Sequence, residues 1–145
     1  MQNINLEEFR HQLDLNVRFM DLDALHHVNN ARYLNFLEEA RIAYSQDVLG
    51  LFRDIKSLNV VVARIEIDYL KPITFGEEVK IYTRVLKMGN TSFDFECIIC
   101  ALNKKEEKIA ARAIQTLVTF DAESKKSIAI PDEVREKIAS YEPVL

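Results

Sequence analysis

The sequence lacks the features that would place the protein in several special classes. Its 145 residues carry a net charge of −4 with no basic cluster, which argues against a nucleic-acid-binding protein. No apolar run approaches the roughly 20 residues that span a bilayer. The first residues are polar and acidic, unlike a secretory or mitochondrial leader. We therefore expect a cytoplasmic protein.

Cysteine is scarce as well. The chain has only two, Cys97 and Cys100, in a C-x-x-C string. That spacing occurs in redox sites and in halves of zinc sites, but there is no second C-x-x-C pair to complete a zinc site. The pair lies in a strand-like run, where this odd separation places the two side chains on opposite faces. We expect both cysteines to be buried and structural.

The rest of the composition is that of an ordinary soluble protein, with 48% hydrophobic and 29% charged residues. A chain of this length most often forms one domain. No repeat, low-complexity segment or linker divides it. We therefore expect a single domain over residues 1–145, large enough to bury a substantial core.

Residues 31–49 carry the only long helical pattern. Asn29 or Asn30 suits the N-cap, and Gly50 suits the C-terminal end. Such a helix would be nearly 30 Å long, at about 1.5 Å per residue. Its apolar residues recur with the helical period and indicate a helix laid on a sheet. The stripe consists of Tyr33, Leu37, Ala40, Tyr44 and Val48, widened by Leu34, Phe36 and Ala43.

Alternating residues predict a strand at 13–20, before the helix, and four long strands after it, at 60–70, 79–88, 92–102 and 109–120. Residues 5–12 favour a short helix or turn, and Pro131 favours a short closing helix. Tight turns between consecutive strands predict an antiparallel meander. One long helix against a large antiparallel sheet is an α+β architecture. Its long strand edges favour pairing with a second subunit.

A polar segment at residues 21–30 joins the first strand to the helix. It holds two carboxylates, two imidazoles and two amides. The first N–H groups of a helix have no intrahelical partner, and the helix dipole adds positive charge there. Such an end can hold an oxygen that becomes anionic in a transition state, beside a carboxylate that attacks or activates water. The junction therefore predicts acyl transfer to water.

A family resemblance is carried by the run at residues 21–34, Asp-Leu-Asp-Ala-Leu-His-His-Val-Asn-Asn-Ala-Arg-Tyr-Leu. It resembles the hotdog-fold acyl thioesterases of the 4-hydroxybenzoyl-CoA thioesterase-like superfamily. The likeness continues through Glu38, Ala40 and Arg41 on the helix. It extends through the segments at residues 64–73, 75–79 and 89–93, and covers roughly residues 12–121.

The resemblance implies a long central helix wrapped by a curved antiparallel sheet of about five strands. It implies an acyl-CoA thioesterase that hydrolyses an acyl thioester to free acid and thiol, the thiol being CoA or acyl carrier protein. It also implies a homodimer or homotetramer with the site where subunits meet, and no metal or bound cofactor. An alternative is a hotdog protein that binds acyl-CoA without cleaving it. A hotdog dehydratase fits less well, because its motif has no counterpart here.

Three residues are expected to carry the chemistry. Asp23 corresponds to the family's catalytic carboxylate, acting as nucleophile or as general base, although aspartate also favours turns and caps. His27 is expected to orient water or contact the thioester carbonyl, or else to be a structural hydrogen-bonding residue. Asn30 lies where the family places a backbone N–H that polarises that carbonyl. Asp21 is expected to make structural hydrogen bonds, and Leu25 departs from the family's Gly or Asn.

Substrate contacts are less well defined by the sequence. Tyr33, Phe36 and Leu37 are candidates to line an acyl pocket, although such a stripe is more often simply core. Arg64 is a candidate for CoA phosphate, as are Lys71 and Lys87, and each is equally compatible with solvated surface. Glu38 and Arg41 have the spacing of a helical ion pair. His26 and His27 lack a third ligand at helical spacing, so we expect no metal site.

Overall fold

The computed structural model describes residues 3–51 and 58–145. The elements in chain order are the short 3-10 helix η1 (Leu6–Glu8), β1 (His11–Asn16), the 3-10 helix η2 (Phe19–Asp21), α1 (Arg32–Asp47), β2 (Val60–Tyr69), β3 (Glu78–Met88), β4 (Ser92–Leu102), β5 (Glu107–Asp121), β6 (Lys126–Ser127) and α2 (Asp132–Tyr141). The predicted helix and the four strands after it are all present, with ends within a few residues of expectation.

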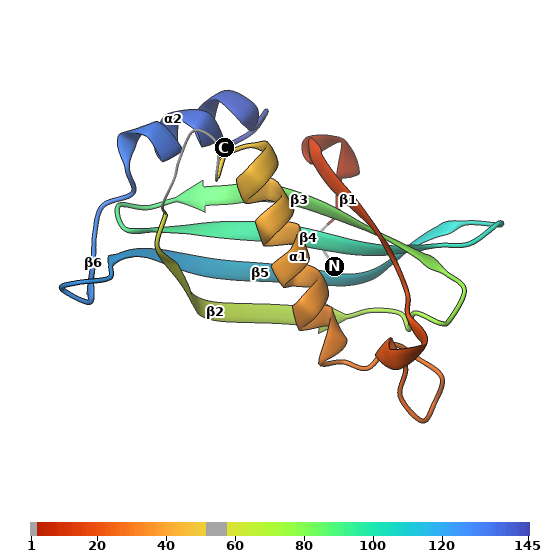
Figure 1. Ribbon diagram of the computed structural model, residues 1–145. Coiled ribbons are helices and arrows are strands. Elements are labelled where there is room, and N and C mark those ends of the chain that lie inside the picture. The colour runs from red at the N-terminus through yellow and green to blue at the C-terminus, as the bar shows by residue number, and fades with distance from the viewer. Residues whose placement is uncertain (1–2, 52–57) are drawn as a thin grey trace.

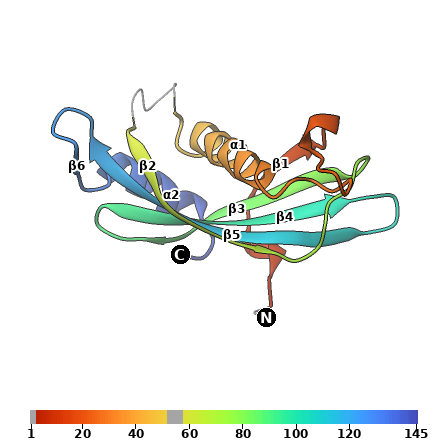
Figure 2. The same ribbon diagram turned by 90° about the horizontal axis from the view of Figure 1, so that it is seen from below.

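The long helix α1 crosses one face of an antiparallel sheet (Figure 1). The strands lie in the order β1-β3-β4-β5-β2, and the short β6 pairs with the end of β5. Seen from below, the sheet curves around α1 (Figure 2). The predicted α+β architecture, one helix on a curved antiparallel sheet, is therefore confirmed.

The predicted meander is correct for β3, β4 and β5 but wrong for β2. Strand β2 pairs with β5 and strand β1 pairs with β3, so β2 and β1 form the two edges. The segment between β2 and β3 contains Pro72 and is too long for a tight turn. It is held against the loop before α1, because the Val28 N–H donates to the Ile73 carbonyl at 2.8 Å and Thr74 bridges to His27. The chain therefore crosses from one edge of the sheet toward the other before it re-enters as β3.

The main core lies between α1 and the sheet. Helix residues Tyr33, Leu37, Ala40 and Tyr44 are buried as the helical period predicts, and they pack against inward residues of β3, β4 and β5. Full burial of one such apolar side chain is worth about 1.5–3 kcal/mol. Leu34, which is predicted to widen the stripe, is 45% exposed, because it lies about 100° around the helix from the buried Tyr33.

The two cysteines lie on opposite faces of β4, as predicted. Cys97 belongs to the core under α1, and Cys100 packs with Phe9, Tyr82 and Ile98 on the other face of the sheet. Burial raises the pKa of the Cys97 thiol to about 11 and that of Cys100 to about 12. Both are therefore neutral thiols at physiological pH, consistent with a structural role.

The first strand is shorter than predicted. It ends at Asn16 instead of continuing to residue 20, and residues 19–21 form η2. The cause is local, because the Asp21 N–H donates to the Arg18 carbonyl at 2.9 Å and turns the chain toward α1. The two carboxylates of residues 21 and 23 consequently do not share one face of a strand.

The closing helix α2 follows Pro131, as predicted, and packs through Val134 and Ile138. Just after it, the carboxylate of Glu142 accepts hydrogen bonds from the Tyr44 hydroxyl at 2.5 Å and from the Val85 N–H at 2.9 Å. This buried residue ties the end of the described chain to both α1 and β3.

In residues 3–51 and 58–145, no helix is long and apolar enough to cross a membrane.

Candidate active site

The polar segment before α1 folds into a closed loop. Three contacts close it in sequence: Asn29 N–H to the Asp21 carbonyl at 2.8 Å, a bridge between Leu22 and Val28, and Asp23 N–H to the His27 carbonyl at 2.8 Å. A fourth bond, from the His26 N–H to the Asp23 carbonyl at 3.0 Å, makes the tip a tight turn. The loop is therefore ordered by its own backbone.

The tight turn requires one residue in the left-handed region, and that residue is His26, with φ of 62°. Histidine is among the residues that adopt this region more often than most. Leu25, the position where the family has Gly or Asn, does not have a positive φ in this structure. Its side chain is 73% exposed and its N–H donates to Asp23. The left-handed position of this turn is thus His26, one residue after the position where the family has Gly or Asn.

Asp23 is fixed by hydrogen bonds to one of its two carboxylate oxygens. Its Oδ1 accepts the N–H of Leu25 at 2.8 Å and the N–H of His27 at 3.3 Å. Its Oδ2 accepts no hydrogen bond from the residues that the structure describes. Asp23 therefore stabilises the turn through Oδ1, and its second oxygen is left available to a substrate or a water.

The start of α1 lies next to this carboxylate. The Asn29 side chain accepts the Ala31 N–H at 2.9 Å in the turn before the helix, but the N-cap residue of α1 is Ala31, not Asn29 or Asn30 as the sequence predicted. The Tyr69 hydroxyl, from the end of β2, donates to the Asn30 carbonyl at 3.1 Å. Within the described chain the N–H of Asn30 donates to no other group. Asn30 lies in the turn just before Ala31 and α1, and a free N–H there is the kind of donor that stabilises a developing oxyanion.

These groups share one cavity of about 390 Å³. The first turn and its loop contribute Asp23, Leu25, His27, Val28, Asn30 and Tyr33, and residues 69–72 complete the lining. The rings of Tyr33 and Tyr69 meet edge to face, with centroids 5.0 Å apart. Burial, with a smaller contribution from Tyr69, raises the pKa of Tyr33 to about 12, so its hydroxyl is neutral at physiological pH.

Four of the predicted site residues line this cavity: Asp23, His27, Asn30 and Tyr33. The other three, Phe36, Leu37 and Arg64, do not. Phe36 lines a different hollow, and Leu37 is fully buried in the core. Arg64 is exposed on β2 and pairs with Glu66.

Two further residues of the cavity wall were not among the main candidates from the sequence, Lys71 and Tyr69. Lys71, a secondary candidate there, does line the cavity, whereas Lys87 pairs with Asp94 at 3.6 Å. Tyr69 was not expected at all, because no local pattern links it to a loop so far away in the sequence.

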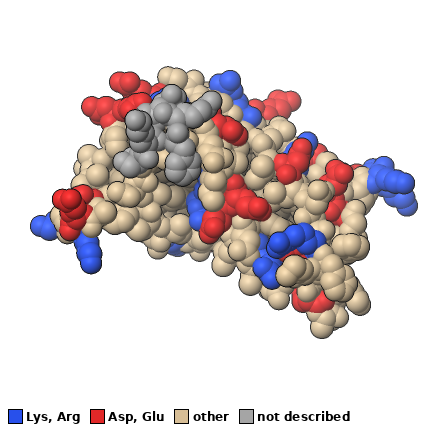
Figure 3. Space-filling model, viewed as in Figure 1, with Lys and Arg blue, Asp and Glu red and all other residues tan. Residues whose placement is uncertain are grey.

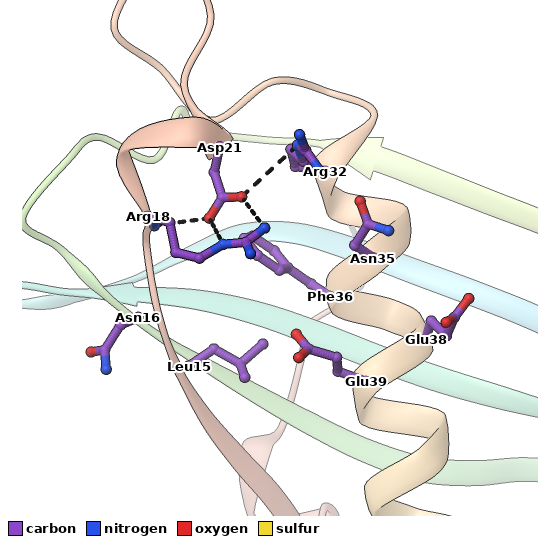
Figure 4. Close-up of a pocket in the computed structure, with 9 residues that line it drawn as sticks. All are labelled: Leu15, Asn16, Arg18, Asp21, Arg32, Asn35, Phe36, Glu38 and Glu39. Atoms are coloured by element: carbon purple, nitrogen blue, oxygen red, sulfur yellow. Dashed lines mark hydrogen bonds and ion pairs between the residues drawn. The ribbon is translucent and has the colours of Figure 1, made fainter.

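Asp21 lines the second hollow, of about 310 Å³, which lies between α1 and the end of β1 with the residues that follow it. Figure 4 shows its carboxylate between Arg18 and Arg32. It accepts the Arg18 N–H at 2.8 Å and Arg18 Nη2 at 3.0 Å, and lies 3.9 Å from Arg32 Nε. Burial opposes its ionisation, but the bonds and charges of Arg18 and Arg32 prevail and hold the pKa of Asp21 below its ordinary value. The predicted structural hydrogen bonds are present.

Charges elsewhere on this face are mixed. Figure 3 shows acidic and basic side chains scattered among uncharged ones over the face that carries α1. Arg41 lies 3.9 Å from Glu38, as their spacing predicts, and also donates to Gln115. Within residues 3–51 and 58–145, no group of three or more His, Cys, Asp or Glu side chains is arranged to hold a metal ion.

Comparisons with known proteins all indicate the same family. Residues 17–138 match the thioesterase-like superfamily. The long-chain acyl-CoA thioesterase FadM of Escherichia coli is 33% identical over 129 residues, which is 88% of this chain and 96% of FadM. The chloroplastic acyl-acyl carrier protein thioesterase ATL3 of Arabidopsis thaliana is 24% identical over 139 residues, covering 94% of this chain and 70% of ATL3.

A solved structure that is similar to this chain is also a thioesterase. A thioesterase from Thermus thermophilus, crystallised with coenzyme A and Zn, has a TM-score of 0.77 and 35% identity, covering 92% of this chain and 95% of that one. The superfamily match spans most of the chain, and the relatives align over most of its length. This chain therefore belongs to the thioesterase-like superfamily and has its hotdog fold, as the resemblance at residues 21–34 predicted.

Proposed function

We propose that this protein is an acyl-CoA thioesterase whose active site is the cavity at the start of α1. Family membership and the relatives named for thioester hydrolysis confirm the reaction class expected from the sequence, a thioester hydrolase. They favour hydrolysis over the alternative of a protein that only binds acyl-CoA. The roles of individual residues rest on the geometry of the cavity.

One arrangement carries the proposal. A carboxylate with one oxygen anchored and the other available lies in the same cavity as Asn30, whose N–H is unused in the turn just before α1. The Asn30 N–H donates a hydrogen bond to the thioester oxygen and stabilises the negative charge that develops there. Asp23 supplies the attack on the carbonyl carbon, and His27, in the same wall, assists by orienting the water.

Asp23 can act by either of two routes, as a general base or as a nucleophile. As general base, its carboxylate takes a proton from a water while that water adds to the carbonyl carbon. As nucleophile, its oxygen adds to the carbon and forms a mixed anhydride, which water then hydrolyses. In each route the carbon–sulfur bond breaks and the thiolate takes up a proton to leave as free thiol. Neither route calls for a metal or a bound cofactor, so we propose that none takes part.

The leaving thiol is proposed to be CoA. FadM is named for acyl-CoA and aligns over nearly its whole length, and the Thermus thermophilus thioesterase was crystallised with coenzyme A. Lys71 lies at the cavity wall, where its ammonium group can meet a CoA phosphate. The more distant ATL3 is named for acyl carrier protein, which makes carrier-bound substrates the necessary comparison.

We also propose a homodimer, or a homotetramer of such dimers, formed through the free edge of β2. This strand ends the sheet order, and in the described part of the chain its outer edge has no partner strand. Val61 and Val62 on it are 45% and 42% exposed. Pairing of two β2 edges would remove an aggregation-prone edge. Because Tyr69 of β2 lines the cavity, such pairing places a second subunit beside the active site.

Oligomeric state is measured directly by size exclusion with light scattering. The double variant Val61→Lys, Val62→Lys should be a monomer and should lose activity, while the wild type is a dimer or tetramer. The matched control, Val144→Lys, adds a charge at another exposed apolar position and should leave the wild-type assembly intact. A monomeric wild type at micromolar concentration would contradict the proposal.

We propose a cytoplasmic location, which fractionation of expressing cells tests.

The function is tested by thiol release from a panel of acyl-CoAs with short, long and aromatic acyl groups, alongside one acyl carrier protein ester. The expected result is CoA release, with long-chain acyl groups tested first because of FadM. Faster release from the carrier protein ester would reassign the leaving thiol. Tight binding of acyl-CoA without release would favour the binding protein. Activity that is unchanged after chelation supports the proposed absence of a metal.

A further inference from the structure

We propose that Asp21 is a positioning residue of the hydrolytic site, which sets the distance between the Asp23 carboxylate and the Asn30 N–H without touching the substrate. This inference rests on the proposed function. Asp21 is not among the residues that line the catalytic cavity, and its side chain, 1% exposed, faces the neighbouring hollow instead. Its influence must therefore act through the loop.

The backbone of Asp21 forms the base of that loop. Its carbonyl accepts the Asn29 N–H at 2.8 Å, and its own N–H donates to the Arg18 carbonyl at 2.9 Å. Asp23 follows Asp21 by two residues, and Asn30 directly follows Asn29. A shift of Asp21 therefore changes the separation between the attacking carboxylate and the oxyanion donor.

The side chain of Asp21 holds this base against the rest of the fold. Its carboxylate contacts Arg18 at the exit of β1 and Arg32 in the first turn of α1 (Figure 4). The strand exit, the loop and the helix start are thereby joined through one buried group. A buried carboxylate that loses its cationic partners is strongly destabilised, so both arginines help to hold the group in its place.

The position of Arg32 supports this assignment independently. A cation at a helix N-terminus opposes the helix dipole, and the first turn of α1 contains no acidic residue to offset it. An arginine there is unfavourable for the helix alone. Its contact with Asp21 from outside the helix provides the compensating charge. The pair therefore serves the junction between loop and helix, where the oxyanion donor lies.

The experiment compares Asp21→Asn with Glu39→Gln by steady-state thiol release and by thermal unfolding. Asparagine keeps an acceptor for the Arg18 N–H but removes the charge that pairs with both arginines. Glu39 is an exposed carboxylate in the same hollow. We expect kcat of Asp21→Asn to fall on the order of 10²-fold with KM little changed, because a displacement near 1 Å has that effect. Glu39→Gln should keep the wild-type kcat and KM.

A double-variant cycle separates positioning from a general loss of folded protein. If Asp21 acts through Asp23, adding Asp21→Asn to Asp23→Asn lowers the residual rate no further. Losses that multiply would overturn the inference. Should Asp21→Asn fail to fold, Arg32→Gln replaces it in the same cycle, since it keeps both Arg18 bonds and the same non-additivity is expected.

Two failures are distinguishable. If the wild type releases no thiol from any ester, the proposed function fails and this inference with it. If the wild type is active and Asp23→Asn is not, while Asp21→Asn matches Glu39→Gln in kcat, the proposed function stands and the positioning role alone is overturned.

Discussion

Asp23 and His27 are joined by two hydrogen bonds. The Asp23 N–H donates to the His27 carbonyl at 2.8 Å, and the His27 N–H donates to Asp23 Oδ1 at 3.3 Å. The Asp23 carboxylate and the backbone that carries the His27 imidazole are thus fixed on one short turn. Such preorganisation lowers the entropic part of the barrier, because the groups need not be gathered at the moment of reaction.

Tyr69→Phe should lower activity modestly. The substitution removes the hydroxyl that donates to the Asn30 carbonyl and keeps the ring that packs on Tyr33. A net hydrogen bond is worth about 0.5–1.5 kcal/mol, so kcat/KM should fall about two- to ten-fold. Steady-state thiol release measures the change. Tyr82→Phe is the matched control, since its hydroxyl bonds Glu107 on the far face of the sheet; equal losses in both variants would contradict the assignment of Tyr69.

The cysteines should be inert in the native protein. Cys97 and Cys100 are fully buried, and burial raises the pKa of their thiols to about 11 and about 12. The thiolate is the reactive form, so an aromatic disulfide reagent at neutral pH should titrate neither residue until denaturant is added. Rapid labelling of the folded protein would show that β4 opens readily. An inert result also makes the same reagent suitable for assays of thiol release.

Glu142 should make stability depend on pH. Burial, opposed by the hydrogen bonds from Tyr44 and Val85, raises the pKa of Glu142 above its ordinary 4.5. As the pH rises from 4.5 toward that higher value, the unfolded chain releases this proton first, so the free energy of unfolding falls. Glu142→Gln should therefore flatten the stability profile in this window. The exposed Glu133→Gln on α2 should keep the wild-type slope, and equal slopes in all three proteins would contradict the prediction.

Much of the fold was predictable because its signals are local. The apolar period of α1, the alternation along β3, β4 and β5, and Pro131 before α2 each depend on neighbours in sequence. The position of β2 depends on contacts that no local pattern encodes. Ile65 pairs with Gln115, and the chain after β2 is held by Val28 and His27 rather than by a turn of its own. The early end of β1 has a local cause, the hydrogen bonds between Arg18 and Asp21, but the alternation of residues does not reveal it.

The candidate site divides in the same way. Asp23, His27 and Asn30 lie within one contiguous motif, so the sequence placed them together. Tyr69 reaches the same cavity only through the fold, and its signal, a tyrosine at the end of a strand, is not specific. Leu37 and Arg64 show the converse error, since helical position and charge alone do not distinguish a pocket wall from core or surface.

The central claim is that Asp23 carries out the attack on the thioester, and Asp23→Asn tests it most directly. The amide oxygen of asparagine can still accept the Leu25 and His27 N–H bonds, so the loop and the unfolding midpoint should be preserved. We predict that thiol release from the best acyl-CoA falls by about 10²- to 10⁴-fold, the range attributed to a lost acid–base group. Hydrolysis at the wild-type rate in Asp23→Asn would contradict the account and move the chemistry to another residue.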